Sequence, residues 1–185
     1  MKQKNNKSKK QKAWVWPLIV LILAISISFV FSFLSELILQ DAIVAVAIIV
    51  IFVFIALSII TDMIGLAVAS SNIEHFTAMA ARKVKGSKQA IALVKNADRV
   101  SSVLNDVIGD VCGILSGAAG ASIVAKIAID NGGNLLSILI PSLIAAIIAG
   151  LTIAGKAVFK RIAIKYANEI TLNFSKFINF FTRKG

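Results

Sequence analysis

Long apolar blocks that alternate with short charged ones are the feature that most constrains how this sequence can fold. Residues 42–61 contain no charged side chain, and as an α-helix they would extend about 30 Å, the thickness of a bilayer's hydrocarbon core. Hydrophobic residues make up 58% of the 185 residues, more than a soluble domain of mixed composition carries. The pattern predicts an all-α integral membrane protein with four transmembrane helices and amphipathic juxtamembrane helices.

The predicted spans are residues 14–36, 42–69, 103–129 and 135–155. Apolar residues recur at helical spacing in the polar loop 72–97 and again in residues 156–172, which predicts juxtamembrane helices on the inner membrane surface. Residues 1–13 are rich in Lys, Gln and Asn, and we expect them to form a disordered basic tail. We expect residues 173–185 to form a basic amphipathic C-terminal tail.

The basic residues, with the exception of Lys126, fall into three groups: the N-terminal tail, residues 82–99, and the chain after residue 155. Pairs of apolar spans separate these groups, which is the positive-inside pattern and predicts a multi-pass cell-membrane protein with both termini in the cytoplasm. A net charge of +11 would suggest nucleic-acid binding in a soluble protein. Because these charges flank apolar spans, we expect the lipid bilayer as a partner and no nucleic acid.

Residues of the kinds that carry out catalysis are scarce in this sequence. It has a single cysteine, Cys112, inside an apolar run, and a single histidine, His75. It has no Ser-His-Asp set, no Cys-x-x-Cys pair and no phosphate-binding loop. We therefore do not expect an enzyme, and we interpret Cys112 as a small packing residue.

Three acidic residues, Asp62, Asp106 and Asp110, lie within or at the ends of predicted spans. A carboxylate at membrane depth is costly, so it usually faces a cavity, a cation or a partner. Asp106 and Asp110 are four residues apart and therefore share one helical face. The oxygen-bearing residues predicted to complete the site are Ser58, Thr61 and Asn105. An all-oxygen set of this kind predicts a metal site for a hard cation such as Mg²⁺.

Other interpretations of the same acids remain open at this point. Asp106 is placed where it can cap the start of a helix that enters the membrane later, since carboxylates are favourable at a helix N-terminus. Asp62 is placed where it can pair with an arginine of the polar loop.

Glycines recur along the third span as Gly109-x-x-x-Gly113-x-x-x-Gly117. Stacked small residues allow another helix to approach closely. The pattern favours packing within the chain, and a seam between two copies is the alternative.

The order of segments over residues 50–172 resembles the transmembrane domain of the cyclin-M (CNNM) and CorB/CorC magnesium transporters. Residues 65–70 are similar to the end of the family's first helix, and residues 105–110 stand at its Gly-Asn-x-x-x-Asn motif, with Asp in place of both Asn. Residues 155–160 stand at its Gly-Glu-x-x-Pro-Lys motif, with Lys156 for Glu and Phe159 for Pro. The N-terminal span is additional, and the CBS domains of many members are absent.

The resemblance implies a homodimeric transporter or channel-like protein for a divalent cation, with Mg²⁺ as the expected ion. The ion would enter from the cytoplasm and meet Asp106, Asp110 and the oxygens near Asp62. The alternative is a non-transporting membrane protein that binds or regulates a partner through its Gly-rich helix face or through a basic cytoplasmic belt formed by the juxtamembrane helices. Lys156 favours this alternative, because its ammonium group can replace the cation by pairing with an aspartate.

Overall fold

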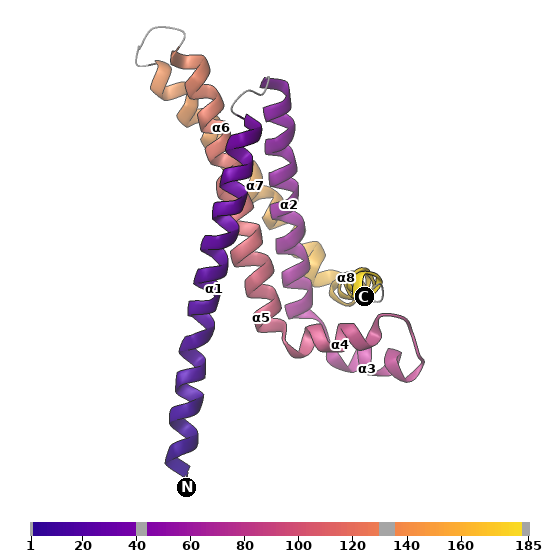
Figure 1. The fold of residues 1–185 in the computed structure, drawn as a ribbon. Helices are drawn as coiled ribbons and strands as arrows, with labels where there is room; N and C mark the ends of the chain where they lie inside the picture. The colour runs from indigo at the N-terminus through magenta and orange to yellow at the C-terminus, as the bar shows by residue number, and fades with distance from the viewer. Residues whose placement is uncertain (1, 40–43, 130–135, 183–185) are drawn as a thin grey trace.

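The computed structural model describes residues 2–39, 44–129 and 136–182, and within these ranges the chain is helical without β-strands. Four helical segments are long and apolar enough to cross a membrane: Trp16–Ser35, Val46–Ser70, Ala97–Ala121 and Ser142–Lys165. They run side by side as a bundle, and the N- and C-terminal helices end on the same side of it (Figure 1). The structure confirms the predicted class, an all-α multi-pass membrane protein.

The first helix, α1 (Lys2–Leu39), begins well before the predicted span. Residues 2–13 continue the helix instead of forming the disordered tail predicted from their composition. Lysine and glutamine are good helix formers, and a span already in helical conformation spares these residues the cost of nucleation. α1 therefore projects beyond the other elements at the N-terminal end (Figure 1).

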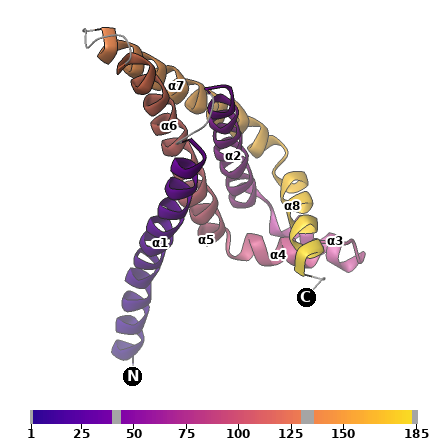
Figure 2. The ribbon, with the colours of Figure 1, turned by 45° about the horizontal axis from the view of Figure 1, so that its top comes forward.

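The second helix, α2 (Val44–Ser70), lies at the centre of the bundle and contacts the third and fourth spans as well as the C-terminal helix (Figure 2). Ile51 and Ile55 of α2 form a buried cluster with Ala119 of the third span. Ile148 of the fourth span packs against this cluster. The three central spans are therefore held together by aliphatic packing in the halves that lie away from the α3–α4 segment, residues 73–95.

The third span is built from α5 (Ala97–Ser102), a π-helical segment η1 (Val103–Gly109) and α6 (Asp110–Ile129). The helical run thus starts six residues before the predicted boundary at residue 103. Asp98 lies in the first turn of α5, where a carboxylate is favourable, and this extends the helix into the polar loop.

The fourth span, α7 (Leu136–Lys165), continues ten residues past the predicted end at 155, and α8 (Ala167–Thr182) follows after a bend at Tyr166. The basic residues after 155 do not end the helix, because long Lys and Arg side chains extend towards water while their stems stay on apolar surface. Residues on both sides of the predicted boundary between 172 and 173 lie within α8.

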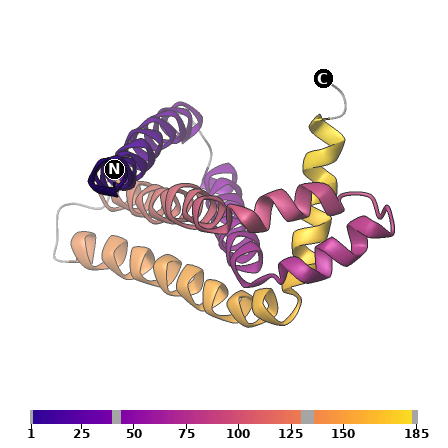
Figure 3. The same ribbon diagram turned by 90° about the horizontal axis from the view of Figure 1, so that it is seen from below.

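The belt consists of α3 (Ile73–Ala81), α4 (Ser87–Lys95) and α8, which crosses the α3–α4 hairpin when seen from below (Figure 3). Phe76 of α3 and Ala90 of α4 are fully buried. Polar bonds tie the hairpin to α8: Ser71 Oγ and Thr171 Oγ1 lie 2.8 Å apart, and Gln89 Nε2 donates to Asn179 Oδ1 at 2.9 Å. The predicted juxtamembrane segment 72–97 therefore packs in one layer with α8, whereas residues 156–165 of the second predicted segment belong to α7.

Candidate cation site

The C-terminal half of α2 packs closely against η1 and the start of α6. Ser58 donates a hydrogen bond from its hydroxyl to the carbonyl oxygen of Gly109. A Cβ atom on Gly109 would lie 3.3 Å from Thr61 Oγ1 and 3.2 Å from the Leu104 carbonyl oxygen, which is tighter than ordinary side-chain packing. Glycine at position 109 therefore allows the two backbones to approach closely.

Asn105 and Gly65 form the other half of this α2–η1 seam. A Cβ atom on Gly65 would lie 1.9 Å from Asn105 Oδ1 and 2.8 Å from Asn105 Cγ. The amide of Asn105 therefore occupies the space that a side chain at position 65 would fill. This close contact with Gly65 fixes the position of the Asn105 side chain against α2.

The π-helical geometry of η1 places Asn105 in this seam. The backbone N–H of Asp110 donates to the carbonyl oxygen of Asn105, five residues earlier, which is the π-helical bond. Such wide turns are uncommon and occur frequently at functional sites of helical proteins. The extra residue in the turn changes the register of the third span at the level of the acids.

Within the part of the chain that the structure describes, two buried oxygens of the seam residues have no hydrogen-bond partner: Asp62 Oδ2 and Asn105 Oδ1. Asp62 is only 7% exposed, and no basic side chain among the described residues forms an ion pair with it. It lies one turn before Gly65 on the same face of α2, so both oxygens belong to the same seam. An unpaired carboxylate in such a place is costly unless a proton or a cation accompanies it.

The hydroxyls of Ser58 and Thr61 complete the polar group on this face of α2, and both are buried. Thr61 Oγ1 donates to the carbonyl oxygens of Leu57 at 2.8 Å and Ser58 at 3.1 Å. Because both hydroxyl protons are committed to backbone carbonyls, the oxygens keep only lone pairs to offer. Ser58, Thr61, Asp62 and Asn105, all predicted from the sequence, are thus brought together at one seam.

Asp106 and Asp110 lie elsewhere, on the exposed face of the third span. Asp110 Oδ1 forms an ion pair with Lys156 Nζ at 2.9 Å, and the side chains are 61% and 17% exposed, respectively. The pairing of Lys156 with an aspartate that the sequence suggested is therefore present. The pair joins α6 to α7 and neutralises Asp110 with a group of the chain itself.

The other interpretations of these acids find no support among the described residues. Asp106 lies inside a helical run that begins at Ala97, so it does not cap a helix start. Asp62 has no arginine partner there. The Gly65–Asn105 contact is not predicted from the sequence, although a glycine one turn from an acid within a span is a signal for it.

The glycines of the third span pack mainly within the chain. A Cβ on Gly113 would meet Ser58 Oγ at 3.3 Å and Thr152 Cγ2 at 3.8 Å, whereas nothing lies within 4 Å of a Cβ on Gly117. The intrachain packing favoured by the sequence thus holds at Gly109 and Gly113.

No protein-family model, curated protein or solved structure matches this chain. Within the described residues, no three His, Cys, Asp or Glu side chains are grouped to hold a metal. A metal ion at the seam would therefore be bound by one carboxylate with amide and hydroxyl oxygens. That donor set fits Mg²⁺, which keeps several of its own waters and needs only one or two carboxylates.

Proposed function

We propose that this chain is a divalent-cation transporter or channel-like membrane protein whose ion, Mg²⁺, binds at the α2–η1 seam. The observation that carries the proposal is that two oxygens of the residues at this seam, Asp62 Oδ2 and Asn105 Oδ1, are buried without a hydrogen-bond partner among the described residues. A cation between these oxygens would offset the cost of burying the carboxylate.

The proposal assigns different roles to the acidic residues than the sequence suggested. Asp62 supplies the charge, and Asn105, Ser58 and Thr61 supply neutral oxygens. Asp106 and Asp110 lie at the exposed edge, where negative charge attracts a cation towards the seam. Lys156 opposes this attraction and neutralises Asp110 in the paired state.

A second candidate function is a non-transporting membrane protein that binds or regulates a partner. The Lys156–Asp110 ion pair favours it, because the chain itself supplies the positive charge that one acid requires. The two candidates differ in a measurable way: the first requires ion movement across a bilayer, and the second requires only a folded bundle.

We propose that the belt faces the cytoplasm of a cell-membrane protein, with both termini on the same side. The support is the positive-inside rule together with the common end of the two terminal helices (Figure 1). In Lys88→Cys on a Cys112→Ala background, the new cysteine should react with an impermeant reagent only after the cells are opened.

A homodimer is the proposed assembly. Asp106, Asp110 and Ile114 lie along one exposed face of the third span, and Ile114 is 71% exposed. Carboxylates that face lipid are costly, so a second copy on this face would remove them from the hydrocarbon. Cross-linking of Ile114→Cys on the Cys112→Ala background tests this assembly.

The decisive experiment is thermal unfolding of the purified protein with and without Mg²⁺. At a hundred times the dissociation constant, bound Mg²⁺ should stabilise the fold by about 2.7 kcal/mol, which raises Tm by about 5–10 °C. Asp62→Asn keeps the shape and removes the charge, so it should abolish this response. Asp98→Asn, at an exposed acid in the first turn of α5, is the matched control and should respond like wild type.

Ion movement is then measured in proteoliposomes that contain a Mg²⁺-sensitive dye. Flux in wild type and its loss in Asp62→Asn support the transporter. Stabilisation by Mg²⁺ without flux supports the non-transporting candidate. If wild type, Asp62→Asn and Asp98→Asn respond to Mg²⁺ alike, the seam is not the site.

A further inference from the structure

An apolar groove lies between α2 and α8, on the side of α8 that faces the spans. Its volume is about 400 Å³, and its lining residues are Ile64, Ile170, Asn173, Phe174 and Phe177. One amide, Asn173, stands among four hydrophobic side chains, so the groove has an apolar wall and a single polar position. None of these residues takes part in the cation site.

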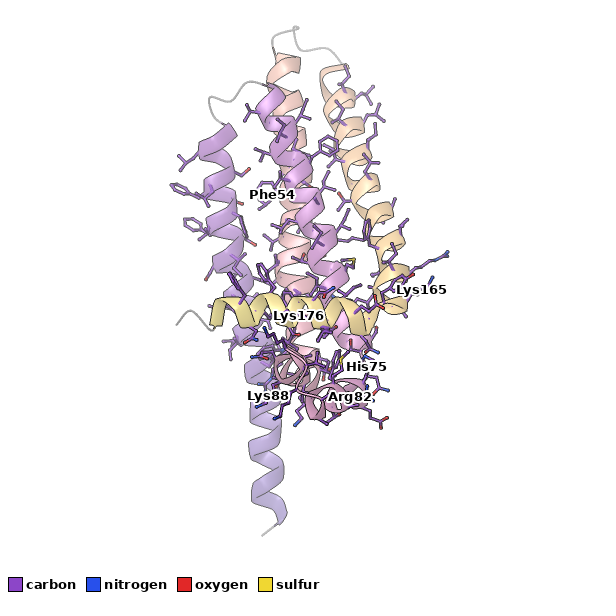
Figure 4. All side chains as sticks on the ribbon, turned by 90° about the vertical axis from the view of Figure 1, so that its right-hand side faces the viewer. Phe54, His75, Arg82, Lys88, Lys165 and Lys176 are labelled. Carbon is purple, nitrogen blue, oxygen red and sulfur yellow. The ribbon has the colours of Figure 1, made fainter. Side chains whose placement is uncertain are left out.

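The depth of the groove corresponds to the boundary between lipid headgroups and acyl chains. Ile64 lies six residues before the end of α2 at Ser70, or about 9 Å along the helix axis. Interfacial helices bury their apolar faces about 5–10 Å into this boundary. α8 runs across the spans at this level rather than along them (Figure 4).

The part of α8 that bears Phe177 and Phe180 presents an aromatic, strongly exposed face at the edge of the groove. Phe177 is 60% exposed and Phe180 is 62% exposed, and Tyr166, at the bend before α8, is 42% exposed. Aromatic side chains in water are unfavourable, whereas at a membrane interface their rings are covered by lipid. This face therefore suits the inner surface of a bilayer better than water.

The charge around the groove is strongly positive. Residues 72–100 and 160–182 carry ten basic and three acidic residues. Lys176 lies one turn after Asn173 on α8, and it is exposed. Figure 4 shows Lys176 on α8, between the spans and the hairpin that bears Arg82 and Lys88. The polar edge of the groove thus faces a basic surface that complements an anionic headgroup.

We propose that the α2–α8 groove binds one acyl chain of an anionic phospholipid, whose headgroup is bound at Asn173 and Lys176. Ile64, Ile170, Phe174 and Phe177 form the wall against the chain. Lys176 and the basic surface below α8 select negative charge. The bound lipid holds α8 against α2 and so links the belt to the bilayer.

The test compares dioleoyl phosphatidylglycerol with dioleoyl phosphatidylcholine, which share their chains and differ in headgroup charge. Each is added to delipidated protein in uncharged detergent, and retained lipid is measured by native mass spectrometry. Wild type should retain the anionic lipid in clear preference. Lys176→Gln should lower that preference about fivefold, the effect of one basic group at an anionic surface. Lys88→Gln removes a charge of the surrounding basic surface, outside the groove lining, and should lower the preference much less than Lys176→Gln.

The apolar wall is tested separately. Ile170→Trp fills the groove and should reduce retention of both lipids, whereas Ile153→Trp, on an exposed face of α7, should not. Dihexanoyl phosphatidylglycerol keeps the headgroup but has short chains, so wild type should retain it poorly. This comparison of chain lengths uses only the wild-type protein, so it can be made even if Ile170→Trp does not fold. Soluble glycerol phosphate should not compete.

Several outcomes would overturn the proposal. They are equal retention of the two dioleoyl lipids by wild type, an equal effect of Lys88→Gln and Lys176→Gln, and full retention of the short-chain lipid. Competition by glycerol phosphate would indicate an anion site without the groove. A change of oligomeric state in Ile170→Trp with lipid retention intact would indicate a protein interface instead.

Discussion

The first two spans have nearly the same mean hydropathy, but they pack very differently. In the most apolar window of α1, 6% of the residues are buried, whereas in that of α2 the share is 33%. Ser26 of α1 bonds to the carbonyl of Ile22 in its own helix, while Ser58 of α2 bonds across to Gly109 in the third span. Apolarity therefore predicts that a helix enters the membrane, and small or polar residues decide what it packs against there.

The largest loss of stability is expected at Gly65, where α2 has no room for a side chain. Gly65→Ala places a Cβ in the space of the Asn105 amide, so that amide must move and the seam must open. We expect a loss of about 1–3 kcal/mol in stability, measured by thermal unfolding in detergent. Gly150→Ala in α7 is the matched control, since nothing lies within 4 Å of its Cβ.

A double variant tests whether the side chains at positions 65 and 105 compete for the same space. Asn105→Ala removes the side chain that occupies the space, so Gly65→Ala combined with Asn105→Ala should recover most of the loss. If the double variant is as unstable as the sum of the two single ones, the two residues do not share that space.

A smaller difference should separate the two serines. Ser58→Ala leaves the buried carbonyl of Gly109 without its donor and should cost about 1 kcal/mol. Ser26→Ala removes a bond to the serine's own helix at an exposed position and should change stability by less than about 0.5 kcal/mol. Equal losses in Tm for the two variants would contradict the conclusion that Ser58 holds α2 against the third span while Ser26 bonds only within α1.

The smallest effect on stability is expected at the contact that attaches α1 to α5. Arg99 of α5 lies over the Trp16 ring, with 5.0 Å between its guanidinium carbon and the ring centroid. Trp16→Leu should cost about 0.5–1 kcal/mol, the usual value of a cation–π contact at an exposed site. A double-mutant cycle with Arg99→Gln measures the coupling. A coupling of zero would mean that other contacts attach α1.

The number of spans and the amphipathic belt follow from sequence patterns alone, because hydropathy and helical periodicity are local properties. The π-helical turn at 103–109 and the bend at Tyr166 do not follow, since a single glycine, Gly109, does not distinguish a π-helical turn from an α-helical one and the residues around Tyr166 include no glycine or proline. Packing against α2 and the hairpin determines both. The same holds for the site: Ser58, Thr61, Asp62 and Asn105 were predicted, but only the fold separates them from Asp106 and Asp110.

The hydrogen bonds that close the belt have a consequence for the order of events during synthesis. Gln89 and Asn179 are 90 residues apart, and Ser71 and Thr171 are 100 residues apart. At the usual elongation rate of about 5–20 residues per second, the α3–α4 hairpin leaves the ribosome roughly 5–20 s before α8. During that interval the face of α4 that contacts α8 in the finished fold has no helix to cover it. We expect the lipid surface to cover this face until translation supplies the final helix.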